Sequence, residues 1–320
     1  MLRRFAWGTL LFTLAVIAWG AFVRASGSGA GCGAHWPLCN GEVVPRPEAI
    51  ETVIELAHRV TSGLSLLAVL ALALFVFRTL PSPHPARLAA AASVFFMLTE
   101  AAVGAGLVLL ELVADDASPA RAYWMAGHLL NTFLLLGALT ATAWWVGAGK
   151  GARPRKPSGS TRWLLGAALF GVLILGASGA IAALGDTLYP ATSLAEGLRE
   201  EFAPGAALLL RLRVAHPALA FTVGAFLVVA VPYLGRRGGD AGSVAISRLV
   251  AWIVLAQLAA GVVNVLLLAP IWLQIVHLLL ADALWIALVL FGLTSSTERA
   301  GTRVAPSAMQ EKTAASGRAG

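Results

Sequence analysis

The sequence predicts an all-α integral membrane protein whose eight transmembrane helices form two pseudo-symmetric four-helix bundles. Three observations predict this fold. The 320 residues are 58% hydrophobic and 12% charged, and the mean hydropathy of +0.81 lies far above that of water-soluble globular proteins. Eight apolar stretches are each long enough to cross about 30 Å of hydrocarbon, which takes roughly 20 helical residues. A polar segment divides these stretches into four and four.

Each predicted span is an apolar run bounded by polar or turn-forming residues. The first run follows Arg3 and Arg4, as in a signal peptide, but it continues to Val23 with no obvious small-residue cleavage motif, so we assign it as a span. The eight predicted spans cover residues 5–23, 53–77, 88–111, 123–147, 163–184, 207–234, 248–269 and 271–293.

Charged residues separate between the two sets of loops that these spans create. One set is basic and contains Arg3, Arg4, Arg78, Arg87, Lys150, Arg153, Arg155, Lys156, Arg162, Arg236, Arg237 and Arg248. The other set holds most of the acids, namely Glu42, Glu48, Glu51, Asp115, Asp116, Asp186, Glu196, Glu200 and Glu201. Because basic loops stay in the cytoplasm, we expect a multi-pass protein of the cell membrane with both termini cytoplasmic. Basicity here reflects topology and is no argument for nucleic-acid binding.

The segment "KGARPRKPSGS" has the composition of a connecting loop and separates two similar halves. We therefore expect an N-terminal bundle over 1–149, a cytoplasmic linker over 150–162, a C-terminal bundle over 163–293 and a disordered cytoplasmic tail over 294–320.

Three pairs of motifs support an internal repeat. "TEAAVGAGLVLLEL" aligns with "AQLAAGVVNVLLLA", which matches Glu100 to Gln257 and Gly104 to Gly261. "IELAHRVTSGL" aligns with "LRVAHPALAFT", and "AGHLLNTFLLLGAL" resembles "IVHLLLADALWIAL". Two four-helix bundles related by duplication are the simplest account of these matches.

Both cysteines, Cys32 and Cys39, lie in the first outer loop. In an oxidising compartment this placement favours a disulfide, which would be either a structural staple or a labile, redox-active bond. A zinc site that used His35 would need two further ligands, which the loop does not clearly supply.

Four of the six histidines, His58, His128, His216 and His277, lie one each in the second, fourth, sixth and eighth spans. These spans all enter from the outside, so the four side chains share one layer near the outer face. A single intramembrane histidine is more often a hydrogen-bonding residue than a ligand, but four at one depth favour ligation. Bis-histidine haem, one in each half, is the best candidate, because a zinc or copper site would need all four in one cluster.

Cations and carboxylates near this layer are the other candidate site residues. Arg24, Arg59, Arg211 and Arg213 lie at a depth that suits haem propionates, although anchoring at the membrane interface explains each of them equally well. Glu55 lies one turn before His58, where it is either an acid–base group or a carboxylate that is paired with Arg59 or exposed at the membrane interface. The aligned residue in the second half is Arg213, so only the N-terminal half is equipped for acid–base chemistry.

Two further acids, Glu100 and Asp282, fall nearer the middle of the membrane, where an unpaired charge costs about 2.5–3.5 kcal/mol on insertion scales. They are expected to be protonated, paired or in a wet cavity. A proton path is conceivable there, but nothing in the sequence names its partners.

Taken together, these motifs resemble the haem A synthase family over residues 5–293. The resemblance rests on "GAFVRASGSGAGC", the two-cysteine loop through "WPLCNG", "IELAHR", and one histidine in each later even-numbered span. It implies an enzyme that oxidises a methyl group of haem O to a formyl group by successive hydroxylations with oxygen from water. It also implies that His58 and His128 flank haem O as substrate and that His216 and His277 ligate haem b.

The same resemblance implies that Glu55 is the essential carboxylate and that Cys32 and Cys39 form a disulfide. The chain departs from the family at three points: the third outer loop lacks a second cysteine pair, position 35 is His, and position 100 is Glu. Expected partners are haem O, haem O synthase, an unidentified electron acceptor, the lipid bilayer and a second copy of the chain.

Two other classes of function use the same residues. A di-haem electron-transfer cytochrome would need the four histidines but not Glu55. A haem assembly factor without chemistry would bind haem and release it unchanged.

Overall fold

The computed structural model describes residues 1–46, 49–149, 151–238 and 241–298. Helices dominate these residues, and each of the eight long ones is apolar enough to cross a membrane, which confirms the predicted all-α fold with eight spans. The long helices are α1 (Leu2–Ala25), α2 (Ile50–Thr79), α3 (Pro85–Leu109), α4 (Pro119–Gly147), α5 (Gly159–Leu188), α7 (Leu208–Gly238), α8 (Ala241–Leu266) and α9 (Ile271–Ser295).

The short elements were not predicted. They are the 3-10 turn η1 (Ser28–Ala30), the helix α6 (Leu194–Glu201) in the loop between α5 and α7, and two strands, β1 (Arg153–Pro154) and β2 (Thr297–Glu298). The strands pair antiparallel, so the segment that follows α9 is joined to the linker between the halves.

Helix ends differ from the predicted spans because helices continue through polar residues that the apolar runs exclude. The second span, predicted as 53–77, is α2 over Ile50–Thr79. The predicted linker is shortened because α5 already begins at Gly159, and the end of α9 with β2 occupies the start of the predicted tail. The rest of that tail, 299–320, lies outside the described residues.

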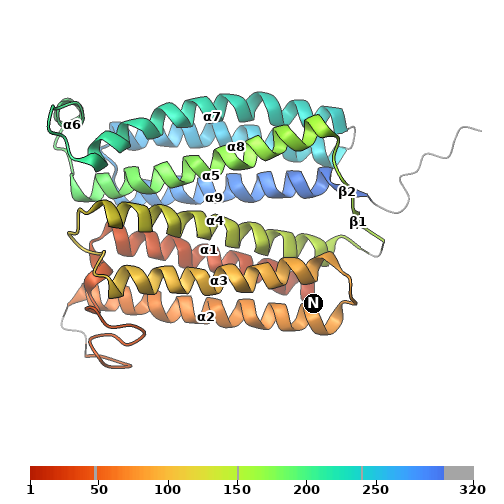
Figure 1. Cartoon of the computed structure of the whole chain (residues 1–320), viewed down its shortest axis with the longest axis horizontal. Helices are drawn as coiled ribbons and strands as arrows, with labels where there is room; N and C mark the ends of the chain where they lie inside the picture. The colour runs from red at the N-terminus through yellow and green to blue at the C-terminus, as the bar shows by residue number, and fades with distance from the viewer. Residues whose placement is uncertain (47–48, 150, 239–240, 299–320) are drawn as a thin grey trace, which may run out of the picture.

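The helices pack as two groups of four (Figure 1). In the first group α1, α2, α3 and α4 contact one another in a ring, and in the second group α5, α7, α8 and α9 do the same. The groups meet through α1 and α4 on one side and α5 and α9 on the other. The four histidine-bearing helices α2, α4, α7 and α9 all begin at the end of the molecule that carries the Cys32–Cys39 loop, which we call the cysteine-loop end.

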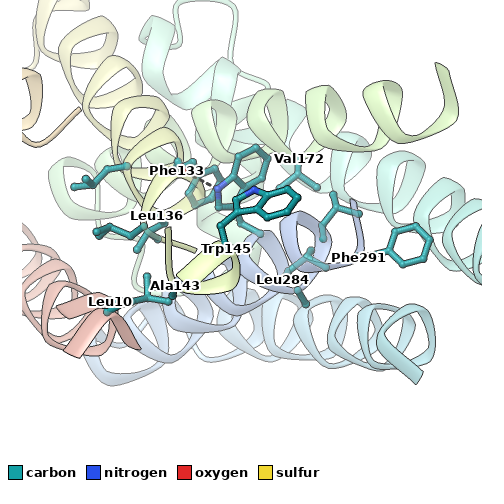
Figure 2. Packing of buried hydrophobic residues seen from close by; sticks show 14 of the residues in the cluster. Leu10, Phe133, Leu136, Ala143, Trp145, Val172, Leu284 and Phe291 are labelled. Carbon is teal, nitrogen blue, oxygen red and sulfur yellow. Dashed lines mark hydrogen bonds between the residues drawn. The ribbon is translucent and has the colours of Figure 1, made fainter. Parts of the chain in front are cut away.

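An aromatic contact lies within the buried hydrophobic cluster that joins the two groups (Figure 2). The ring of Phe133 from α4 stacks on Trp285 of α9 at 5.4 Å between centroids and 11° between planes. The indole Nε1 of Trp285 donates a 2.5 Å hydrogen bond to the carbonyl oxygen of Phe133. Gly176 of α5 allows this approach, since a Cβ there would lie 2.6 Å from Cε2 of the Phe133 ring.

This packing predicts the effect of a single methyl group. We expect Gly176→Ala to lower the midpoint temperature of thermal unfolding in detergent, because overpacking a close-packed interior costs about 1–3 kcal/mol. The control is Gly166→Ala in the same helix, where nothing lies within 4 Å of the added Cβ. Alanine there favours the helix by up to about 1 kcal/mol, so the control is unchanged or more stable. Equal midpoints for the two variants would contradict this description of the interface.

Candidate haem-binding sites

Cys32 and Cys39 form a disulfide, as predicted, and both residues are buried. The loop is docked on the first turns of α2. Thr52 Oγ1 donates a 2.7 Å hydrogen bond to the carbonyl oxygen of Gly31. A Cβ on Gly31 would lie 2.4 Å from backbone atoms of Glu51, so only glycine allows this approach. The loop is therefore fixed against the helix that carries Glu55 and His58.

Glu55 is buried, with 3% of its surface exposed, and its carboxylate is bonded both to this loop and to Arg59 of its own helix. Its Oε2 accepts a 2.7 Å hydrogen bond from the backbone N–H of Cys32. Its Oε1 accepts hydrogen bonds from Nε and Nη2 of Arg59 at 3.0 and 2.5 Å. A carboxylate offers about four acceptor positions, so roughly one position is left for a further proton or donor.

Arg59 links the carboxylate to the rest of the disulfide loop. Its Nη1 donates to the carbonyl oxygens of His35 and Leu38, each at 2.5 Å. Four of its five N–H groups are thereby used, so the guanidinium has one donor left for a propionate. The ion pair between Glu55 and Arg59, one of the two alternatives drawn from the sequence, is present, and the proposed catalytic role of Glu55 stays a prediction.

The imidazole of His58 rests on a glycine of α1. A Cβ on Gly20 would lie 2.8 Å from Cε1 and 3.0 Å from Nε2 of this ring. The ring nitrogen Nδ1 is buried and has no hydrogen-bond partner among the described residues. An orphaned ring nitrogen inside an apolar bundle is the feature expected of an unmetallated ligand.

His128 on α4 lies beside a polar cluster that contains Glu100. Glu100 Oε1 is 3.4 Å from its Nδ1, an ion-pair distance rather than a hydrogen bond. Glu100 also accepts hydrogen bonds from Asn131 Nδ2 at 2.6 Å and from Thr132 Oγ1 at 2.5 Å. A carboxylate on one ring nitrogen is a common way to orient a histidine whose other nitrogen binds metal.

In the second half, the rings of His216 and His277 lie close together in an edge-to-face arrangement. Their ring centroids are 6.5 Å apart and their planes are nearly perpendicular, at 86°. Each ring again rests on a glycine, since a Cβ on Gly179 would lie 3.0 Å from Cε1 of His216 and a Cβ on Gly261 would lie 3.1 Å from Cε1 of His277.

One nitrogen of each ring is oriented by a neighbour in the second half. Ser178 Oγ lies 2.9 Å from Nδ1 of His216, and Gln257 Nε2 lies 3.2 Å from Nε2 of His277. The Nδ1 of His277 is buried and unpartnered within the described ranges. The aligned pairs Glu100–His128 and Gln257–His277 thus make corresponding contacts, as the sequence repeat implies.

The spacing of this second pair fits one iron atom. Two metal–nitrogen bonds of about 2 Å each, with roughly 1 Å from each nitrogen to its ring centre, place two imidazole centroids roughly 6 Å apart. The observed 6.5 Å agrees with that value. The described residues contain no group of three or more His, Cys, Asp and Glu side chains that could hold a metal ion, which disfavours a four-histidine zinc or copper site.

The remaining arginines predicted near the propionates have other partners. Arg24 reaches from α1 into the second half, where it donates to the carbonyl oxygen of Ala183 at 2.8 Å, to Thr187 Oγ1 at 2.6 Å and to Gln274 Oε1 at 2.8 Å. It therefore joins α1 to α5 and α9, which sequence reasoning did not foresee.

Arg213 and Arg211 differ although they are two residues apart. Arg213 is paired with two carboxylates, Glu201 at 2.6 Å and Asp186 at 3.1 Å. Arg211 is exposed and lines a surface pocket of about 330 Å³ with Glu201, Phe202, Ala203, Pro204 and Val214. Of the four predicted arginines, Arg211 has its guanidinium least engaged by the described residues.

Sequence analysis also missed Arg121 at the start of α4. Only 4% of Arg121 is exposed, and its Nη1 donates to the carbonyl oxygens of Ala114 and Asp116 at 2.6 and 2.8 Å. Its Nε is buried without a partner in the described part of the chain. Arg121 lies seven residues before His128, hence two turns away on the same helical face, a spacing that could have identified it.

Comparison with known proteins assigns the chain to a family. A family model described as cytochrome oxidase assembly protein matches residues 3–289. A protein of Alkalihalophilus pseudofirmus named heme A synthase is 42% identical over 101 residues, which cover 32% of this chain and 34% of that protein. A heme A synthase of Geobacillus kaustophilus is 40% identical over 108 residues, or 34% of each chain.

A longer match comes from Thermus thermophilus, in a protein named protoheme IX farnesyltransferase. It is 48% identical over 303 residues, which cover 95% of this chain but 50% of the relative. The chain therefore spans about half the length of this curated relative. Because the family model covers nearly the whole sequence, the chain belongs to the cytochrome oxidase assembly protein family.

Proposed function

We propose that this protein is a haem A synthase, which oxidises one methyl group of haem O to a formyl group with oxygen taken from water. The observation that carries the proposal is an asymmetry between two similar sites. Both halves contain a pair of histidines at the same depth, but only the first has a buried carboxylate one turn before a histidine. In the second half Arg213 stands at the position of Glu55, so acid–base chemistry is available in one half only.

Haem O as substrate would be held between His58 and His128, and haem b between His216 and His277. Support comes from the glycines under three of the four rings, from the orphaned ring nitrogens and from the 6.5 Å spacing of the second pair. The apolar helices around these rings suit the porphyrin face. When bound, haem b would supply a one-electron carrier, because its iron alternates between ferric and ferrous states.

Each hydroxylation breaks one C–H bond of the methyl group and forms a C–O bond to a water oxygen. In each round two protons pass to water and two electrons pass to an external electron acceptor. After the second round the hydrated aldehyde loses water and leaves the formyl group. Glu55 is the residue proposed to accept a proton, since it lies in the substrate half with one acceptor position free. The N–H of Cys32 and the guanidinium of Arg59 hold its carboxylate in a single orientation.

The proposal places both haem sites near the outer face of the cell membrane. All four histidines lie about two turns from the start of helices that begin at the cysteine-loop end. Basic loops lie at the opposite end, and basic loops are cytoplasmic. The disulfide at the cysteine-loop end agrees with an oxidising compartment there.

A farnesyltransferase that acts on protohaem is the proposed supplier of the substrate. The Thermus relative bears the name of such an enzyme and is about twice as long as the region it shares with this chain. If the half of that relative outside the shared region carried the named activity, linkage would raise the effective concentration of the two activities and favour direct transfer between them.

The first test concerns Glu55. We expect Glu55→Ala and Glu55→Gln to keep haem b but to make about 10²–10⁴-fold less haem A, which is the usual contribution of a positioned acid–base group. The control is Glu51→Gln, because Glu51 lies in the same helix with an exposed side chain. The measurement is the haem A content of membranes by extraction and chromatography. Normal haem A production by the Glu55 variants would remove Glu55 from the mechanism.

The second test concerns the ligands of the second half. His216→Ala and His277→Ala are each expected to lose the absorption bands of haem b from the purified protein, because one imidazole cannot hold the iron from both sides. His84→Ala is the control, since His84 caps α3 and lies in a loop outside the bundle. Haem b bound at full occupancy in either variant would refute this ligand assignment.

The third test concerns the reaction itself. The full chain is expressed together with a haem O synthase, and the extracted haems are analysed by mass. The alcohol and aldehyde products of haem O are expected. Haem O recovered with unchanged mass would favour the assembly factor. Two haems b per chain and no oxidised product would favour the electron-transfer cytochrome.

A further inference from the structure

Asp282 of α9 is a buried carboxyl group that the proposed reaction does not use. None of its surface is exposed. Both of its carboxyl oxygens are buried and neither has a hydrogen-bond partner within the described ranges. It lies five residues beyond His277, deeper in the membrane and on a different side of the helix. An ionisable residue in this position marks a functional site by default.

The sequence repeat shows that packing alone does not explain this residue. Asp282 lies five residues after His277, and the corresponding residue five after His128 is Phe133. Phe133 crosses from the first half into the second, where it stacks on Trp285 beneath Gly176. An apolar side chain at position 282 would fill the interface without the desolvation cost of a carboxyl group.

One charged group acts on Asp282 among the described residues, and it belongs to the other half. This group is Glu100 of α3, which repels a negative charge on Asp282. Glu100 is held by Asn131 and Thr132 and lies 3.4 Å from the His128 ring. The helices packed against α9 carry Arg3, Arg4, Arg24, Arg121, His128, Arg162, Asp186 and Arg248, and in the described structure none of these groups forms an ion pair with Asp282.

No cation therefore balances a negative charge on Asp282, and Glu100 disfavours one. In a low-dielectric interior such a carboxyl group keeps its proton until a positive charge arrives nearby. The proposed function supplies such a charge, because the iron between His216 and His277 would gain one positive charge each time it lost an electron.

We propose that Asp282, buried on α9, is a proton-exchanging carboxyl group that compensates the charge of each electron moved. Asp282 binds one proton when one electron arrives in the second half and releases that proton when the electron leaves. Only its O–H bond forms and breaks. The electron comes from the oxidised methyl group, and the proton comes from and returns to water. This inference rests on the proposed function, since it requires haem b between His216 and His277.

The test is an electrochemical infrared difference spectrum of the full chain with its bound haem. The wild-type spectrum is expected to show a C=O band of a protonated carboxyl group that changes between the reduced and oxidised states. Asp282→Asn is expected to lose this band. Asp282→Glu is expected to keep it at a shifted frequency. Glu196→Gln is the control, because Glu196 is partly exposed on α6, and the side-chain hydrogen bonds seen for it in the described structure are to Thr192.

The midpoint potential of the bound haem provides a second readout. In the wild type the potential is expected to fall as pH rises, by up to about 59 mV for each tenfold fall in proton concentration when one proton accompanies one electron. Asp282→Asn is expected to weaken this dependence, whereas Glu196→Gln leaves it unchanged. If Asp282 were only a structural residue, Asp282→Asn would not weaken the pH dependence of the midpoint potential.

The outcomes separate this inference from the proposed function. Absence of haem from the wild type would defeat both. Bound haem and oxidised products, with an Asp282→Asn spectrum and pH slope equal to those of the wild type, would overturn the role of Asp282 alone. If neither Asp282→Asn nor Asp282→Glu bound haem, Asp282 would be a structural residue, and the inference would likewise fail.

Discussion

The structure depends on holding imidazole side chains inside an apolar bundle with a ring nitrogen free. A histidine is too polar to face lipid and too bulky to lie between closely packed helices, so space must be made for it. Gly20, Gly179 and Gly261 provide that space, each directly beneath a ring. The neighbouring hydrogen bonds then orient the rings rather than neutralise them. Two helices that carry histidines at one depth can therefore hold an iron between them, and the second half shows the required spacing.

The two halves share this design and differ where the proposed chemistry requires it. In the internal repeat, Glu55 aligns with Arg213, Glu100 aligns with Gln257, and Phe133 aligns with Asp282. Each pair places a carboxyl group where the other half has a cation, an amide or a ring. Two of these acids lie in the first half and Asp282 lies at the interface that faces it. Under the proposed function, the half that binds substrate would have to move protons, whereas the half that carries electrons would need only its ligands and charge compensation. The uneven distribution of acids agrees with that division.

Much of this arrangement could be predicted because the periodicity and composition of the sequence determine it. Hydropathy gave the spans, the repeat paired Glu100 with Gln257 correctly, and two cysteines in one loop gave the disulfide. The contacts of long polar side chains could not be predicted. Depth alone suggested propionate partners for Arg24 and Arg213, but Arg24 bonds to α5 and α9, and Arg213 pairs with Glu201 and Asp186. A flexible side chain reaches partners on several helices, and one sequence does not specify which. The helix α6 was missed because its eight residues lack an apolar run.

The central claim is that two imidazoles bind one iron within each half. Electron paramagnetic resonance of the oxidised, haem-loaded protein tests it most directly, because the signal reports the axial ligands and spin state of ferric iron. In protein prepared without haem O, the account predicts a low-spin, six-coordinate signal from haem b held by two imidazoles, and this signal disappears in His216→Ala and His277→Ala. A high-spin, five-coordinate signal from the haem of the second half, or a low-spin signal that survives both substitutions, would contradict it.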